Sequence, residues 1–96
     1  MRKIEADMLT AVQTCEYWQS GNTNVVPFFD PETGAESTRV YLHGNHIADV
    51  TKGKPVKVNI KTLLRWPTST TVSRLRALGV EVRIKGRVPY INGIRV

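Results

Sequence analysis

The spacing of apolar residues changes once along this chain, and that change restricts the folds open to it. Up to Trp18, the apolar residues Ile4, Met8, Val12 and Cys15 recur at intervals of three and four, which predicts an amphipathic helix over residues 2–18. Beyond residue 22, apolar and polar residues alternate, as they do in half-buried strands. A helix followed by strands predicts an α+β fold.

Turn residues separate the expected strands, with hairpins predicted at Gly44-Asn45, Gly86-Arg87 and Asn92-Gly93. The expected strands are residues 23–29, 37–42, 46–50, 56–60, 80–85 and 88–91, followed by a short segment at 94–96. A short second helix is predicted within residues 66–79. Because only this helix interrupts the strands, we expect one mainly antiparallel sheet of five to six strands, in the order α-β-β-β-β-α-β-β. We expect the 96 residues to form a single small globular domain.

The chain lacks the sequence features of secreted and membrane proteins. Its single cysteine, Cys15, cannot form an internal disulfide, and we expect it to be a small apolar residue within the first helix. No apolar run reaches the roughly 18 residues of a membrane span, and the charged N-terminus lacks the apolar stretch of a signal peptide. These features predict a cytoplasmic protein with no membrane partner.

Charge is divided unevenly between the two halves of the chain. Residues 1–50 hold three Lys or Arg against seven Asp or Glu, a balance of −4. Residues 51–96 hold eleven Lys or Arg against the single Glu81, a balance of +10. Such segregation indicates a polyanionic partner for the basic half.

Alternation in two of the expected strands places the cations opposite the core. Val56, Val58 and Ile60 would face the core and leave Lys57 and Lys61 outside, and the strand at 80–85 repeats this pattern. If these strands are neighbours, their cations form one basic platform. The candidate nucleic-acid-binding residues are Lys57, Lys61, Arg83, Lys85 and Arg87, with Lys52, Lys54, Arg74 and Arg76 at the margin of the platform.

Four consecutive hydroxyl residues, Thr68 to Thr71, precede the second helix. Thr68 or Ser69 suits the N-cap, where a hydroxyl accepts a bond from a free backbone N–H. Thr70 and Thr71 would then lie at a helix N-terminus, which attracts anions. Two readings stay open: hydroxyls that only cap the helix, or an anion site at Thr70 and Thr71.

Catalytic and metal-binding patterns are weak. His43 and His46 bracket a turn and would be cross-strand neighbours, but no third metal ligand is near them in sequence, so a polar pair beside a turn is the better interpretation. No nucleophile elbow, phosphate-binding loop or paired carboxylate stands out. We therefore expect a non-enzyme without cofactor or metal.

Four segments carry a resemblance to known proteins: "SGNTNV" (20–25), "STRVYLHGNHIADV" (37–50), "WPTSTTVSRLRALG" (66–79) and "YINGIRV" (90–96). Together they resemble a group of small bacteriophage-encoded proteins. The resemblance covers nearly the whole chain and implies phage origin, a compact helix-plus-sheet domain and a location in the host cytoplasm.

Two functions fit these observations. One is nucleic-acid binding through phosphate contacts of the basic half. The other, suggested by the phage resemblance, is an inhibitor that docks on an acidic host protein, with aromatic anchors beside the cations. The candidate anchors are Phe28, Phe29, Tyr41 and Tyr90.

Overall fold

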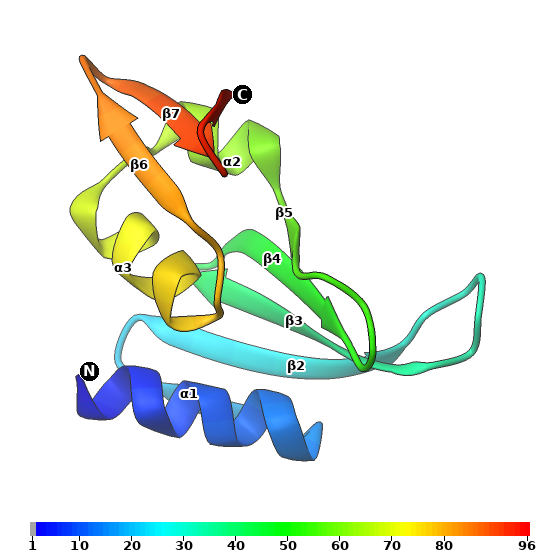
Figure 1. Ribbon diagram of the computed structural model, residues 1–96. Coiled ribbons are helices and arrows are strands. Elements are labelled where there is room, and N and C mark those ends of the chain that lie inside the picture. Colours follow the sequence, from blue (N-terminus) through cyan, green and yellow to red (C-terminus); the bar gives the residue numbers. More distant parts are fainter. Residues whose placement is uncertain (1) are drawn as a thin grey trace.

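The structure, a computed structural model, describes residues 2–96 and confirms an α+β fold (Figure 1). In chain order the elements are α1 (Lys3–Thr14), β1 (Trp18–Ser20), β2 (Thr23–Phe29), β3 (Glu36–Leu42), β4 (Asn45–Thr51), β5 (Lys57–Val58), α2 (Ile60–Arg65), α3 (Ser69–Ala77), β6 (Val82–Lys85), β7 (Val88–Ile91) and β8 (Ile94–Arg95). The strands form two antiparallel sheets, β1 to β5 and β6 to β8. The first is the predicted antiparallel sheet of five to six strands, but the strands expected at 80–85 and 88–91 form a second sheet instead of extending it, because alternation shows which face a residue takes, not which strands share hydrogen bonds.

Helix α1 ends at Thr14 rather than at Trp18. Cys15 takes a left-handed conformation (φ 52°) at the end of the helix, and its N–H donates to the carbonyl of Val12 at 3.3 Å. The next N–H donates to the carbonyl of Ala11 at 3.0 Å, so the last carbonyls of the helix are satisfied in a Schellman motif. Cys15 therefore caps the helix instead of lying within it, and Trp18 is free to begin β1.

Three two-residue turns set the registers of the hairpins. At His43-Gly44, Gly86-Arg87 and Asn92-Gly93, both residues have positive φ, as a type I′ turn requires. The last two match the predicted turns. The first is displaced by one residue, since Asn45 already belongs to β4. Gly21, which fits the end of the first helix by sequence, has φ 54° in the turn between β1 and β2.

The strand expected at 56–60 is cut short by a helix that the sequence did not reveal. Only Lys57–Val58 pairs with β4, and Asn59 then caps α2. The Oδ1 atom of Asn59 accepts the N–H of Thr62 at 3.2 Å, which satisfies one of the free donors at a helix start. Ile60, which fits the alternation of a strand, is therefore the first residue of α2.

Both sheets and all three helices share one core. Met8 of α1, Leu63 of α2 and Leu75 of α3 are buried in one hydrophobic cluster. Val40 of the first sheet and Val82 of the second belong to the same cluster. In Figure 1, α1 lies alongside β2, and the β6–β7 hairpin lies at the opposite end of the molecule. The second sheet is thus held at the far end of the molecule, with one face on the core.

Candidate nucleic-acid interface

The basic platform predicted from two neighbouring strands does not exist in that form. Lys57 lies in β5 of the first sheet, whereas Arg83 and Lys85 lie in β6 of the second. The two strands therefore do not pair. Their cations occupy two separate surfaces, and each surface has to be judged by its own neighbours.

The second sheet has one apolar and one basic face. In β6, Val82 is buried, whereas Arg83 and Lys85 are exposed on the other side. The register places Arg83 opposite Tyr90 of β7, and Tyr90 opposite Arg95 of β8. Because directly opposed residues of antiparallel strands project to the same side, the tyrosine lies between two arginines in one row. The outward face of the second sheet consists of Arg83, Lys85, Val88, Tyr90 and Arg95.

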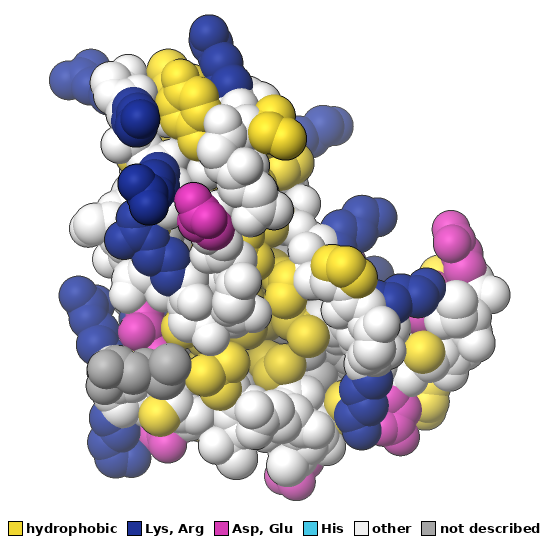
Figure 2. All heavy atoms as spheres, in the orientation of Figure 1, with side chains coloured by type: hydrophobic (Ala, Val, Ile, Leu, Met, Phe, Trp, Pro, Cys, Tyr) yellow, Lys and Arg dark blue, Asp and Glu magenta, His cyan; other side chains and the backbone are white. Residues whose placement is uncertain are grey.

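Little negative charge opposes these cations. Arg83 Nε lies 3.6 Å from Glu81 Oε1, but the two side chains are 66% and 58% exposed. Such a solvated pair is weak and leaves the arginine able to exchange partners. Arg87 adds a cation at the tip of the hairpin, and a shallow groove along β6 is lined by Arg76 and Lys85, among others. Figure 2 shows Lys and Arg side chains gathered over this end of the molecule.

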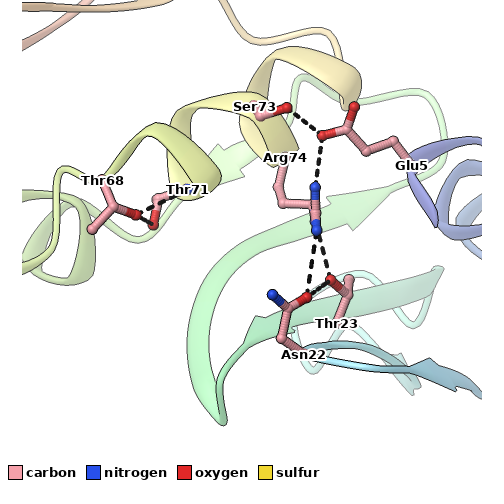
Figure 3. A network of polar contacts seen from close by, with 7 residues as sticks. All are labelled: Glu5, Asn22, Thr23, Thr68, Thr71, Ser73 and Arg74. Carbon is pink, nitrogen blue, oxygen red and sulfur yellow. Dashed lines mark hydrogen bonds and ion pairs between the residues drawn. The ribbon is translucent and has the colours of Figure 1, made fainter. Parts of the chain in front are cut away.

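Arg74 does not belong to this surface, so the prediction that it helps to bind nucleic acid is corrected. Its side chain is only 3% exposed. Nη1 donates to Glu5 Oε2 at 2.8 Å, Nε to Thr23 Oγ1 at 3.0 Å and Nη2 to Asn22 Oδ1 at 3.4 Å (Figure 3). The guanidinium therefore joins α3 to α1 and to the start of β2. Its role is structural.

The carboxylate of Glu5 is held in its charged form by these contacts. Burial raises the pKa of Glu5, but hydrogen bonds from Ser73 and Arg74, together with the positive charge of Arg74, outweigh that effect. The pKa of Glu5 consequently lies below its ordinary value of 4.5. A buried ion pair is thus fully formed at neutral pH.

Of the four hydroxyl residues at the start of α3, Thr68 is the N-cap and the other three belong to the first turn of the helix. Thr68 Oγ1 accepts the N–H of Thr71 at 3.2 Å and lies 3.0 Å from the hydroxyl of Thr71 (Figure 3). Thr71 is 3% exposed. This geometry confirms the capping interpretation for Thr68 and places Thr71 out of reach of an anion in solvent. Of the two residues predicted for an anion site, only Thr70 is partly exposed, which does not make a site.

Four lysines predicted for the platform lie on other elements. They are Lys52 and Lys54 in the β4–β5 turn, Lys57 in β5 and Lys61 in α2. Lys52 Nζ is 3.3 Å from Glu36 Oε2, and Lys57 is directly opposite Asp49 of β4. Acidic side chains of the first half of the chain therefore lie close to two of these lysines, Lys52 and Lys57, and offset part of their charge.

The four candidate aromatic anchors are not brought together. Phe28, Phe29 and Tyr41 belong to β2 and β3, whereas Tyr90 is in the second sheet. The guanidinium of Arg39 lies 4.4 Å from the ring centre of Phe28, and Phe29 is 72% exposed. Among the four, Tyr90 alone shares a face with the cations of the second sheet.

The two histidines do not form a metal site. His46 Nε2 is 2.6 Å from Asp49 Oδ1, and His46 Nδ1 is 3.2 Å from Asn59 Nδ2. Since Asn59 uses its oxygen to cap α2, its amide nitrogen must donate, and His46 Nδ1 accepts. Both ring nitrogens are thus engaged, while His43 is exposed in the turn. No group of three metal-ligating side chains occurs within residues 2–96.

Arg95 is the residue of the outward face that sequence reasoning missed. It lies in a strand of two residues, too short for alternation to be recognised. A signal was nevertheless present in the Asn92-Gly93 turn, which pairs Ile94 with Ile91 and therefore Arg95 with Tyr90.

The fold and this surface define a small α+β protein with a basic, aromatic-bearing sheet face. None of its helices within residues 2–96 has the length and apolar character needed to cross a bilayer. The chain belongs to the Kyanoviridae Gp96 protein family, whose model matches residues 1–93. This match confirms the resemblance to phage proteins. Neither the curated proteins nor the solved structures contain a match to the chain.

Proposed function

We propose that this phage protein binds nucleic acid, without catalysing a reaction, through the outward face of the second sheet. The observation that supports the proposal is the row Arg83–Tyr90–Arg95, in which both arginines are exposed and Tyr90 is half-buried. Lys85 and Arg87 extend its positive charge along β6 and the hairpin tip. Phosphates supply the complementary charge, and arginine binds them with paired N–H groups.

The salt dependence of binding tests the proposal. If the four cations of this end each neutralise one phosphate, log affinity falls against log salt with a slope of about −3.6 for a duplex or about −2.8 for a single strand. Fluorescence anisotropy of labelled DNA between about 50 and 200 mM salt measures this slope. The double variant Arg83→Ala/Arg95→Ala should roughly halve it.

A matched control removes two cations from the first sheet. Lys52→Ala/Lys54→Ala lowers the net charge by the same amount, and we expect it to keep the slope of the wild type. Absence of binding, affinity that ignores salt, or equal effects of the two double variants would contradict the proposal.

Docking on an acidic host protein is less well supported by the arrangement of the anchors. Phe29 is next to Asp30 in sequence and pairs with Glu36, so an acidic partner would be repelled where this ring is exposed. Affinity purification from host lysate, with and without nuclease, distinguishes the two functions. A stoichiometric protein that survives nuclease and is lost on Phe29→Ala would favour docking.

A further inference from the structure

We infer that the ligand of the outward face is a single-stranded nucleic acid, with one base stacked on the ring of Tyr90. The inference rests on the proposed function and adds the class of nucleic acid. Two observations support it: Tyr90 lies between two arginines in the sheet, and no guanidinium stacks on its ring.

Tyr90 occupies the middle strand of the three. Its cross-strand neighbours are Arg83 on one side and Arg95 on the other. Opposed side chains of this kind start about 5 Å apart, so a base lying on the ring would have a guanidinium on each side of it. Bases that stack on a ring between cations, with the backbone held by those cations, are the common mode of single-strand recognition.

The ring of Tyr90 is half-buried and takes no part in the cation–π contacts of residues 2–96. Arginine stacks on two other rings, Arg39 on Phe28 at 4.4 Å and Arg65 on Trp66 at 4.7 Å. No guanidinium lies over Tyr90 anywhere in residues 2–96. Tyr90 is half-buried, and in a chain that stacks arginine on other rings its accessible part has no guanidinium over it, which leaves that part available to a ligand.

A duplex fits the same face less well. Its bases expose only their edges, and the major groove admits a helix or a free two-stranded ribbon. The β6–β7 hairpin is not free, because α3 packs against β6 and α2 packs against β7. A duplex would therefore contact the arginines through its phosphates and leave Tyr90 unused.

The test compares one labelled DNA strand of about 12 nucleotides, as a single strand and as a duplex, in the anisotropy assay. Tyr90→Leu removes the aromatic ring, Tyr90→Phe keeps it, and Tyr17→Leu removes an exposed tyrosine elsewhere (64% exposed). We expect the wild type to prefer the single strand. Tyr90→Leu should weaken single-strand binding on the order of 5- to 150-fold, with an unchanged salt slope and unchanged duplex binding. Tyr90→Phe and Tyr17→Leu should bind as the wild type does.

Two failures can be told apart. Salt-dependent binding that is equal for both forms and unaffected by Tyr90→Leu would overturn the single-strand inference and leave the proposed function standing. Absence of salt-dependent binding to either form would overturn both.

Ultraviolet cross-linking of the wild type to the single strand tests the inference without depending on the folding of any variant. An adduct in the peptide that contains residues 88–91 supports the inference. An adduct confined to β2 or β3 overturns it.

Discussion

Glu5 and Arg74 are 69 positions apart in the chain and form an ion pair at 2.8 Å that is almost completely shielded from solvent. The pair joins the first helix to the third. A charge buried in this way is tolerated only while its partner is present. The contact between α1 and α3 therefore depends on both residues together.

Removing either partner should destabilise the fold strongly. We expect Glu5→Leu and Arg74→Met each to lower the free energy of unfolding by about 3–5 kcal/mol, because each leaves the other charge buried and unpaired. Glu5→Leu/Arg74→Met should cost much less than the sum of the single changes. Urea denaturation measures the cycle. Lys3→Met, which breaks an exposed ion pair with Asp7, is the control and should change stability by at most about 0.5 kcal/mol.

Low pH should lower the stability of the fold, because the carboxylate of Glu5 becomes protonated. Because the pKa of Glu5 is lowered in the folded state, the unfolded chain takes up a proton first as the pH falls. The stabilising contribution is complete above the ordinary pKa of 4.5 and is lost as the pH drops through the lower folded pKa. Thermal melts between about pH 6 and pH 3 should show this decline, and Glu5→Gln should show a smaller one. An equal decline in both proteins would contradict the assignment.

Two buried threonines should respond in opposite ways to the same substitution. Thr38 is fully buried, and its hydroxyl has no hydrogen-bond partner within residues 2–96, so Thr38→Val should stabilise by about 1 kcal/mol. Thr23 is equally buried, but its hydroxyl accepts from Arg74, so Thr23→Val should destabilise by about 1–3 kcal/mol. Denaturation midpoints that move in the same direction would refute this difference.

Of the four hydroxyl groups at the start of α3, only that of Thr68 should stabilise the helix as an N-cap. Thr68→Ala removes the acceptor of the Thr71 N–H and should cost about 1 kcal/mol. Ser69→Ala, one position later, is the matched control, and a neutral result is expected there. Equal losses at both positions in chemical denaturation would show that the cap is shared.

The residue that sequence reasoning missed gives a sharp test of the interface. Arg95→Ala and Arg83→Ala should each reduce the salt slope of binding by about one, because both arginines flank Tyr90. Lys61→Ala removes the same charge from α2 and should leave the slope unchanged. If Lys61→Ala reduces the salt slope as much as Arg95→Ala does, binding depends on the net charge of the protein and not on the residues of the outward face.

Much of the fold could be predicted because its signals are local. The apolar stripe of α1, the alternation of β3 and the Gly86-Arg87 and Asn92-Gly93 turns all depend on residues a few positions apart. The short helix α2 escaped notice because Ile60 fits the alternation of the preceding strand. The end of α1 was misplaced because Cys15 takes the left-handed conformation usually left to glycine.

The candidate site was harder to predict, since it depends on partners distant in sequence. Nothing near Arg74 indicates that its charge is buried, because Glu5 and Thr23 come from the other half of the chain. Alternation correctly placed Arg83 and Lys85 outside the core. It could not show that Lys57 belongs to another sheet.

Each strand of both sheets pairs with its neighbour in sequence, and that order has a consequence for how the molecule folds. Hairpins close over short loops at small entropic cost, so they can form one after another while the ribosome is still releasing the chain. The contact between Glu5 and Arg74 has to wait for most of the remaining sequence. Helix α1 can pack on β2 early, but its contact with α3 is among the last to form, and this late step is where folding should be slowest.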